Sequence, residues 1–121
     1  MSTTSTIAMK NEDGTYISIY CHLDGCPSHH LPILEKNYSE PKDVERLLSY
    51  GDMSVLAERC EGSPNNSFDN SDGNTCIYYG RDRGEEDTDP KIYHNYNDLK
   101  FNSQSYLYVY DPETKTWEVE E

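Results

Sequence analysis

Residues Thr15–Leu34 read TYISIYCHLDGCPSHHLPIL, and this stretch decides how the rest of the chain is organised. From Tyr16 to Leu23 the side chains alternate between two faces, which is typical of a β-strand with one buried face. The Asp-Gly pair that follows favours a turn, because glycine accepts the positive φ that turns require. After Pro27, the spacing of apolar residues from Leu31 to Tyr38 is helical. The sequence therefore predicts a strand that leads into a helix through a polar, histidine-rich turn.

The predicted strand has two chemically different faces. We expect the more apolar face to reach the core; it carries Ile17, Ile19, Cys21 and Leu23. The other face presents two tyrosine rings, a hydroxyl and an imidazole, from Tyr16, Ser18, Tyr20 and His22. Rings and hydrogen-bonding groups on one face are suited to binding, so this face is a candidate surface.

Further short strands are predicted at 6–10, 75–79, 105–110 and 116–120. The first of them forms a hairpin with the strand at 16–23, and the last two form a second hairpin. A second helix follows a cap at Ser39 or Glu40, with Pro41 in its first turn, and ends at Gly51. Its buried stripe is predicted to contain Val44, Leu47 and Leu48.

The remaining segments are less regular. One more helical turn is expected after Asp52, and residues 80–90 form a charged loop. Segment 91–101 is compatible with a short helix or with irregular structure. Residues 61–74 are rich in Ser, Asn, Asp and Gly, which predicts a flexible loop.

This order of elements predicts an α+β fold. We expect an antiparallel sheet of about five strands with two or three short helices packed on one face, because the apolar face of a sheet must be covered. The chain has 121 residues, enough for a single domain, 1–121, with one modest core.

The composition is acidic and rich in tyrosine. The chain has 10 basic and 23 acidic residues, a net charge of −13, and eleven tyrosines. Such a chain is repelled by nucleic acids and by anionic membranes, so we expect neither as a direct partner. The acidity is compatible with simple solubility or with an acidic surface that meets a basic groove on another protein. No signal peptide or membrane span is recognisable, so we expect reduced thiols in the cytoplasm.

The cysteines and histidines near the turn raise the possibility of zinc. The candidate ligands are Cys21, His22, Cys26, His29 and His30. Adjacent strand residues point to opposite faces, so Cys21 and His22 cannot readily share a metal. We expect no metal or other cofactor. His22 with Asp24 would also suit a catalytic pair, but nothing supplies an oxyanion site; we expect Asp24 to cap the turn and His22 to hydrogen-bond across the sheet.

Arg81 and Arg83 are the only closely spaced basic residues in the second half of the chain. They follow Tyr78 and Tyr79, and guanidinium groups beside aromatic rings are suited to a phosphate-bearing nucleotide. Acidic residues surround them, so internal salt bridges that order the loop are the alternative. The surrounding acids are Asp82, Glu85, Glu86, Asp87 and Asp89.

Several segments together resemble a family of small, mostly uncharacterised proteins encoded by bacteriophages and prophages. They are residues 18–29 (SIYCHLDGCPSH), Gly51-Asp52-Met53-Ser54, 81–85 (RDRGE) and the Tyr-rich hairpin 106–117. The sequence departs from that pattern at Leu23, where the family has Trp, and at Cys26, where it has an aromatic residue. The resemblance implies a phage accessory protein without supplying an activity.

These observations predict a non-enzymatic phage protein of the host cytoplasm that blocks a bacterial defence effector through an acidic, Tyr-rich surface. The acidic surface is expected at Glu85, Glu86, Asp87 and Asp89. The alternative is a pocket that sequesters a nucleotide-derived immune signal, and an enzyme acting on nucleotides through His22 and Asp24 is a third, less favoured hypothesis. The partner is thus a host defence protein or a nucleotide-derived signal, and a homo-oligomer is compatible with either. The candidate binding residues are Tyr20, His22, Asp24, His29, Tyr79, Arg81, Arg83, Tyr106 and Tyr108.

Overall fold

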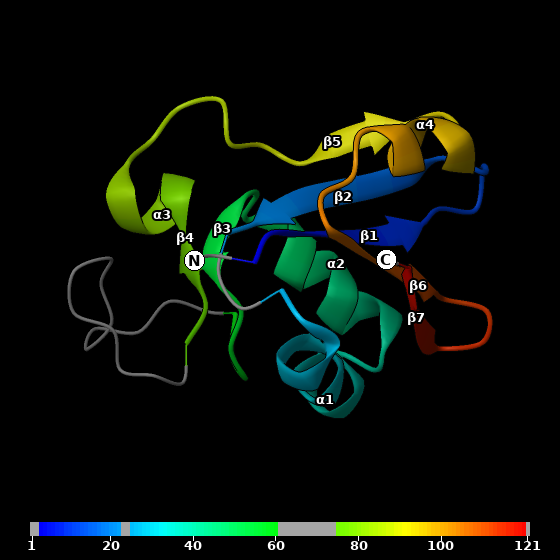
Figure 1. Cartoon of the computed structure of the whole chain (residues 1–121), viewed down its shortest axis with the longest axis horizontal. Coiled ribbons are helices and arrows are strands. Elements are labelled where there is room, and N and C mark those ends of the chain that lie inside the picture. Colours follow the sequence, from blue (N-terminus) through cyan, green and yellow to red (C-terminus); the bar gives the residue numbers. More distant parts are fainter. Residues whose placement is uncertain (1–2, 23–24, 61–74, 121) are drawn as a thin grey trace.

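The computed structural model describes residues 3–22, 25–60 and 75–120. Within them the chain forms one mixed sheet and four helices (Figure 1). The strands are β1 (Ser5–Lys10), β2 (Tyr16–Cys21), β3 (Met53–Val55), β4 (Ile77–Tyr78), β5 (Lys91–Tyr93), β6 (Tyr106–Asp111) and β7 (Thr116–Glu120). The helices are α1 (Pro27–Asn37), α2 (Pro41–Ser49), α3 (Tyr79–Arg83) and α4 (Tyr96–Phe101). The fold is α+β as predicted, but the sheet has seven strands, more than expected.

The predicted first hairpin is confirmed and lies at the centre of the sheet. The strand order is β4-β3-β2-β1-β6-β7, and β5 also pairs with β2. β1 and β2 are antiparallel, with Ile7 opposite Ile19. The N–H of Asn11 closes the turn by donating to the carbonyl of Thr15 over 2.8 Å. Ile19 and Cys21 are buried and Ile17 packs against the same core, which confirms the predicted core face at these three residues, whereas Leu23 lies outside the described residues.

The sheet is not purely antiparallel, which corrects the expectation from the sequence. The C-terminal hairpin of β6 and β7 forms as predicted, but β6 runs parallel to β1, with Leu107 opposite Thr6. β3 is likewise parallel to β2, with Met53 opposite Cys21. Parallel strands need a long crossover connection, and most of the chain lies between β1 and β6. Such a pairing leaves no local signal in the sequence.

Several segments differ from the predicted secondary structure. The helical turn expected after Asp52 is strand β3, and the charged loop 80–90 begins with helix α3. Segment 91–101 divides into β5 and α4. The strand expected at 75–79 shortens to β4, which is preceded by a single bridge between Arg59 and Thr75. The flexible loop predicted at 61–74 lies outside the described residues.

The two longer helices begin at prolines. α1 begins at Pro27, earlier than the expected start at Leu31, because the missing N–H of proline has no helical acceptor to lose in the first turn. α2 follows the prediction, with Pro41 at its start. Its expected buried stripe is confirmed, since Val44, Leu47 and Leu48 are fully buried. Gly51 follows it with φ of 85°, which confirms the predicted glycine at this helix end.

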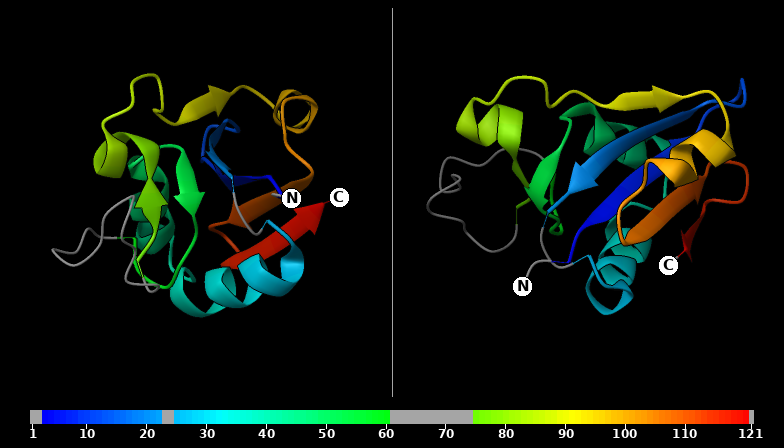
Figure 2. Two further views of the ribbon diagram at one scale, coloured as in Figure 1. Left: turned by 60° about the vertical axis from the view of Figure 1, so that its left-hand side comes forward. Right: turned by 45° about the horizontal axis from the view of Figure 1, so that its top comes forward.

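Helices cover both faces of the sheet, not one as expected. α1 and α2 lie on one side and α4 on the other (Figures 1 and 2). The large core lies between the sheet and the first two helices and includes Ile7, Ile19, Leu34, Leu47 and Tyr108. A smaller core of Ala8, Leu99 and Leu107 lies beneath α4. The alternate residues of β1 and β6 thus supply two separate cores.

Buried tyrosines explain much of the unusual composition. Tyr38, Tyr78, Tyr108 and Tyr110 are at most 3% exposed. Each hydroxyl donates to a backbone carbonyl, respectively that of Ala57, Leu47, Gly25 and Ser39. Each of these rings therefore fills the core while its hydroxyl satisfies a backbone carbonyl, three of them in loops and that of Leu47 in the last turn of α2. These four tyrosines act as internal supports for the backbone around the core.

Gly25 has a different role from the one predicted for it. Its φ is not positive; the positive-φ glycines of the described chain are Gly14, Gly51 and Gly84. Instead, the N–H of Gly25 donates to the carbonyl of Thr3 over 2.9 Å. A Cβ at this position would lie 2.8 Å from the same oxygen. Close approach of the N-terminal backbone therefore explains the glycine.

Candidate functional site

The polar face of β2 brings together part of the predicted binding surface. The hydroxyl of Tyr20 lies 2.7 Å from Nδ1 of His22, which directly follows β2, so this bond joins two neighbouring side chains of one segment, where a bond across the sheet was expected. Burial, and then the neighbouring Tyr79, raise the pKa of the Tyr20 hydroxyl. Tyr20, His22 and Tyr79 thus form one half-buried polar group on this side of the sheet.

Asp52 joins this group at a break in the sheet. β5 pairs with β2 only along Tyr16–Ser18, and β3 pairs with it only at Cys21. In the interval, the N–H of Tyr20 donates to Oδ1 of Asp52 over 2.9 Å. Burial raises the pKa of Asp52; the hydrogen bond from the Tyr20 N–H and, to a smaller extent, the positive charge of Lys91 oppose this shift without cancelling it. A carboxylate therefore completes the hydrogen bonding of the strand where the two neighbouring strands leave a gap.

A polar cavity of about 230 Å³ opens at this break. Asp52 and Lys91 contribute its two charged groups. Hydroxyls and amides from β1, β2, β5 and the connection between α4 and β6 make up most of the remaining wall: Thr6, Ser18, Tyr20, Tyr93, Asn102 and Gln104. Sequence reasoning placed Ser18 and Tyr20 on a candidate face but did not predict that the other residues join them, because they converge only through the pairing of β5 with β2 and the placement of α4.

Arg81, the main residue of the predicted nucleotide pocket, is used inside the protein. Its Nε and Nη2 donate to the carboxylate of Asp82 over 3.1 and 3.0 Å. Its Nη1 and Nη2 donate to the carbonyls of Cys60 and Cys76. The guanidinium also lies 4.8 Å from the centroids of two tyrosine rings. The alternative of an internal salt bridge is therefore the arrangement that the structure contains.

The other predicted binding residues do not gather into one site. Tyr108 is fully buried in the large core, which corrects its assignment to a surface, and Tyr106 packs against that core. His29 lies on α1, with Nε2 3.3 Å from the carbonyl of Leu56. Asp24 and the side chain of Arg83 lie outside the described part of the structure. Tyr106 and Tyr108 both lie on the face of β6 that packs against the large core, so they do not join the polar face of β2.

The predicted acidic surface is exposed. Glu85, Glu86, Asp87 and Asp89 are all exposed in the connection between α3 and β5. The middle of this connection is tied to the end of α2, because the carbonyl of Thr88 accepts the N–H of Asp52 over 2.7 Å. The acidic loop is therefore held at a fixed place beside the sheet break.

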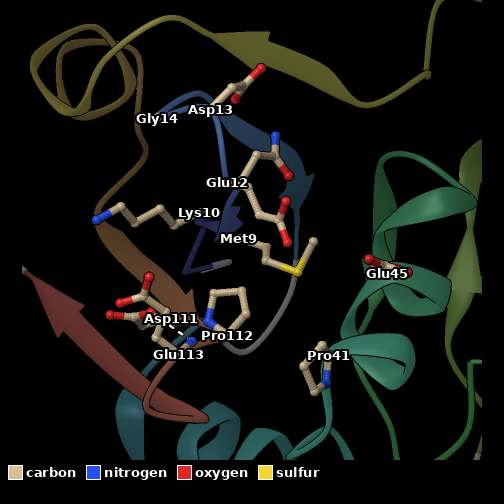
Figure 3. A pocket seen from close by; sticks show the side chains of 11 residues that line it. Met9, Lys10, Glu12, Asp13, Gly14, Pro41, Glu45, Asp111, Pro112 and Glu113 are labelled. Atoms are coloured by element: carbon tan, nitrogen blue, oxygen red, sulfur yellow. Dashed lines mark hydrogen bonds between the residues drawn. The ribbon is translucent and has the colours of Figure 1, made fainter.

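A second acidic region, which the sequence did not reveal, forms an open groove of about 860 Å³ (Figure 3). Three distant segments build it: the β1–β2 turn, the start of α2 and the β6–β7 turn. Its carboxylates are Glu12, Asp13, Glu45, Asp111 and Glu113, against one lysine, Lys10. Met9, Pro41 and Pro112 add apolar surface. Each turn is visibly acidic in the sequence, but only the parallel pairing of β1 with β6 brings the turns together.

The cysteines and histidines considered for zinc do not assemble a metal centre. Cys21 is buried in the large core, and the four cysteines form no disulfide. Among the described residues, no three His, Cys, Asp or Glu side chains come together in a way that could hold a metal ion. His30 is fully buried, with Nε2 2.9 Å from the hydroxyl of Ser5.

Acid should destabilise the protein through His30. Burial, reinforced by His29, lowers the pKa of His30 from its usual 6.5 to about 3. Between these values the unfolded chain binds the extra proton and the folded chain does not. Stability is therefore complete above pH 6.5 and decreases below it, by about 1.4 kcal/mol per pH unit. Urea unfolding should show a loss of about 2 kcal/mol between about pH 6.5 and 5.

The matched controls for this prediction are two glutamine substitutions on α1. His30→Gln removes the buried titrating group, so the stability of this variant should depend much less on pH in the same range. His29→Gln changes the half-buried neighbour and should keep most of the pH dependence. An unaltered slope in His30→Gln would assign the acid sensitivity to another group.

None of the described helices has the length and apolar character needed to cross a lipid bilayer. Compared with protein families, curated proteins and solved structures, the chain shows no significant match.

Proposed function

We propose that this chain is a phage-encoded protein that blocks a bacterial defence effector in the host cytoplasm by binding to it, without catalysis. The observation that carries this proposal is the acidic groove formed by the β1–β2 turn, the start of α2 and the β6–β7 turn. Five carboxylates and one lysine line it, in a chain whose net charge is −13. The partner surface that complements it is basic.

The shape and lining of the groove favour insertion of an arginine or lysine side chain from that partner. Pro41, Pro112 and Met9 can contact the apolar stem of such a side chain, while the carboxylates bind its charged end. Glu12, Glu45 and Glu113 are exposed, so each ion pair contributes only about 0.2–1 kcal/mol. Several ion pairs at the charged end, together with the apolar stem packed against proline, fix the orientation of the inserted side chain.

The exposed acidic loop adds attraction at longer range. Glu85, Glu86, Asp87 and Asp89 lie at one end of the molecule, and the turns that form the groove lie at the other (Figure 1). Exposed charges act over about 10 Å at 0.1 M salt, so the two acidic regions attract a basic partner largely independently. The nucleotide-signal alternative has less support, because the guanidinium of Arg81 already bonds to Asp82 and to two backbone carbonyls.

Two sets of charge-neutralising substitutions test where the contact lies. The groove set is Glu12→Gln, Glu45→Gln and Glu113→Gln; the loop set is Glu86→Gln, Asp87→Asn and Asp89→Asn. Both remove the same charge from exposed positions. With a fluorescent arginine-containing peptide as the probe, the groove set should weaken binding by about tenfold, or 1.4 kcal/mol, and the loop set by much less. Equal losses would mean that net charge alone attracts the peptide.

The biological part of the proposal is tested in bacteria that carry individual defence systems. Expression of the chain should restore plaque formation by a phage that one of these systems blocks, and the groove set should lose this effect. The protein and its target should also separate as salt is raised. If the groove set restores plaques as well as the original chain does, the groove is not the contact surface.

A further inference from the structure

The cavity at the break in the sheet contains a charge that the fold does not require. Asp52 supplies an oxygen to the N–H of Tyr20 over 2.9 Å. The side-chain oxygen of an asparagine would satisfy that N–H equally well. The carboxylate adds a negative charge that burial disfavours, as the raised pKa of Asp52 shows. A partly buried charge on a cavity wall, beyond what the backbone needs, is suited to a ligand with a cationic group.

Lys91 supplies the opposite charge on the wall of the same cavity. Its side chain belongs to an exposed residue of β5, and its charge acts on the Asp52 carboxylate. Lys91 would repel a purely cationic ligand. Asp52 and the net charge of −13 would repel a purely anionic one. A ligand with one charge of each sign fits both groups.

The size and the remaining lining restrict this ligand further. At the packing density of protein interiors, a cavity of about 230 Å³ holds about ten non-hydrogen atoms. That space suits a molecule of amino-acid size. Tyr20 and Tyr93 offer aromatic rings, which attract ammonium and guanidinium groups, and Asn102 and Gln104 offer amides.

We propose that this cavity binds a small zwitterion, an amino or guanidino acid, whose cationic group faces the carboxylate of Asp52 and whose anionic group faces the ammonium of Lys91. The site is separate from the acidic groove and does not depend on the function proposed for that groove. The cavity opens between the end of β5, the segment after α4 and the polar face of β2.

The experiment is an NMR titration of the ¹⁵N-labelled chain with γ-guanidinobutyrate, a guanidino acid of this size. Saturable shifts are expected at the amides of Tyr20, Asp52 and Tyr93. Asp52→Asn and Lys91→Gln should each lower the affinity by about fivefold or more, since each removes one charge-assisted contact. The absence of saturable shifts at these amides up to about 20 mM would overturn the proposal.

The controls separate ligand binding from effects on the fold. Asp52→Asn keeps an oxygen for the N–H of Tyr20, so its melting temperature should not fall. Glu35→Gln and Lys36→Gln make the same charge changes at exposed positions on α1, on the opposite side of the sheet, and should leave the titration unchanged. If Asp52→Asn binds the probe as tightly as the original chain, the carboxylate is not part of a ligand site and the proposal is wrong. Unchanged affinity in Lys91→Gln would likewise overturn the assignment to a zwitterion.

Discussion

Arg81→Ala should destabilise the protein by about 3–5 kcal/mol, the cost of removing one partner of a largely buried ion pair. The guanidinium bonds to Asp82 and to the carbonyls of Cys60 and Cys76. Its side chain is only 21% exposed, and that of Asp82 is 10% exposed. Alanine leaves the carboxylate and two carbonyls without these donors, in a place where little water can replace them. Urea unfolding at pH 7 measures the loss.

Arg81→Lys is the matched control for this prediction. Lysine keeps the positive charge but cannot reproduce the planar fork that reaches the carboxylate and both carbonyls. It also cannot reproduce the contact of the guanidinium with the rings of Tyr50 and Tyr78, each 4.8 Å away. We therefore expect lysine to recover only a small part of the stability. A loss below about 1 kcal/mol in Arg81→Ala would mean that these contacts contribute little, as exposed ion pairs do.

Gly51→Ala should destabilise the protein by about 3 kcal/mol or more, because it combines an unfavourable backbone conformation with a steric clash. Gly51 has φ of 85°. A Cβ at this position would lie 2.1 Å from the carbonyl oxygen of Thr88. The same oxygen accepts the N–H of Asp52, so moving it away breaks the bond that holds the acidic loop against the end of α2. Thermal and urea unfolding measure the effect.

Gly84→Ala provides the comparison. Gly84 also has a positive φ, 76°, but no atom outside its immediate chain neighbours lies within 4 Å of the position of its Cβ. Its substitution should cost only the conformational part, about 1 kcal/mol. Similar losses in the two variants would show that the clash at Gly51 is relieved by small movements, and that the loop from α3 to β5 adapts easily.

Local chemistry determined the parts of the fold that could be predicted from the sequence. Each of the correctly predicted elements has a pattern that spans only a few residues. These patterns are the alternation along 16–21, the Asn11–Gly14 turn and the stripe of Val44, Leu47 and Leu48. The terminal hairpin is equally local. The parallel pairings of β1 with β6 and of β2 with β3 join residues that are far apart in the sequence, so no short pattern predicted them.

The same distinction explains the candidate sites. Tyr20 and His22 are two residues apart on one strand, and their contact follows from the alternation. The positions of Asp52 and Lys91 around one cavity, and of two acidic turns and the start of α2 around one groove, follow from topology alone. The predicted nucleotide contact of Arg81 has less support for a related reason. Its guanidinium donates to the carbonyls of Cys60 and Cys76, and the sequence does not reveal where these backbone groups lie.

The central position of β1 has a consequence for the order in which the protein acquires its structure during synthesis. β1 is synthesised well before its neighbour β6, which begins only at Tyr106. Until then, the edge of β1 that later pairs with β6 has no partner strand, and Ile7, Met9 and Ile19 have only part of their core. A nascent β1–β2 hairpin is therefore open to pairing with other chains while the residues between β2 and β6 are being made. The sheet cannot be completed before β6 and β7 have been made, so it forms as a unit at that point and not progressively along the chain.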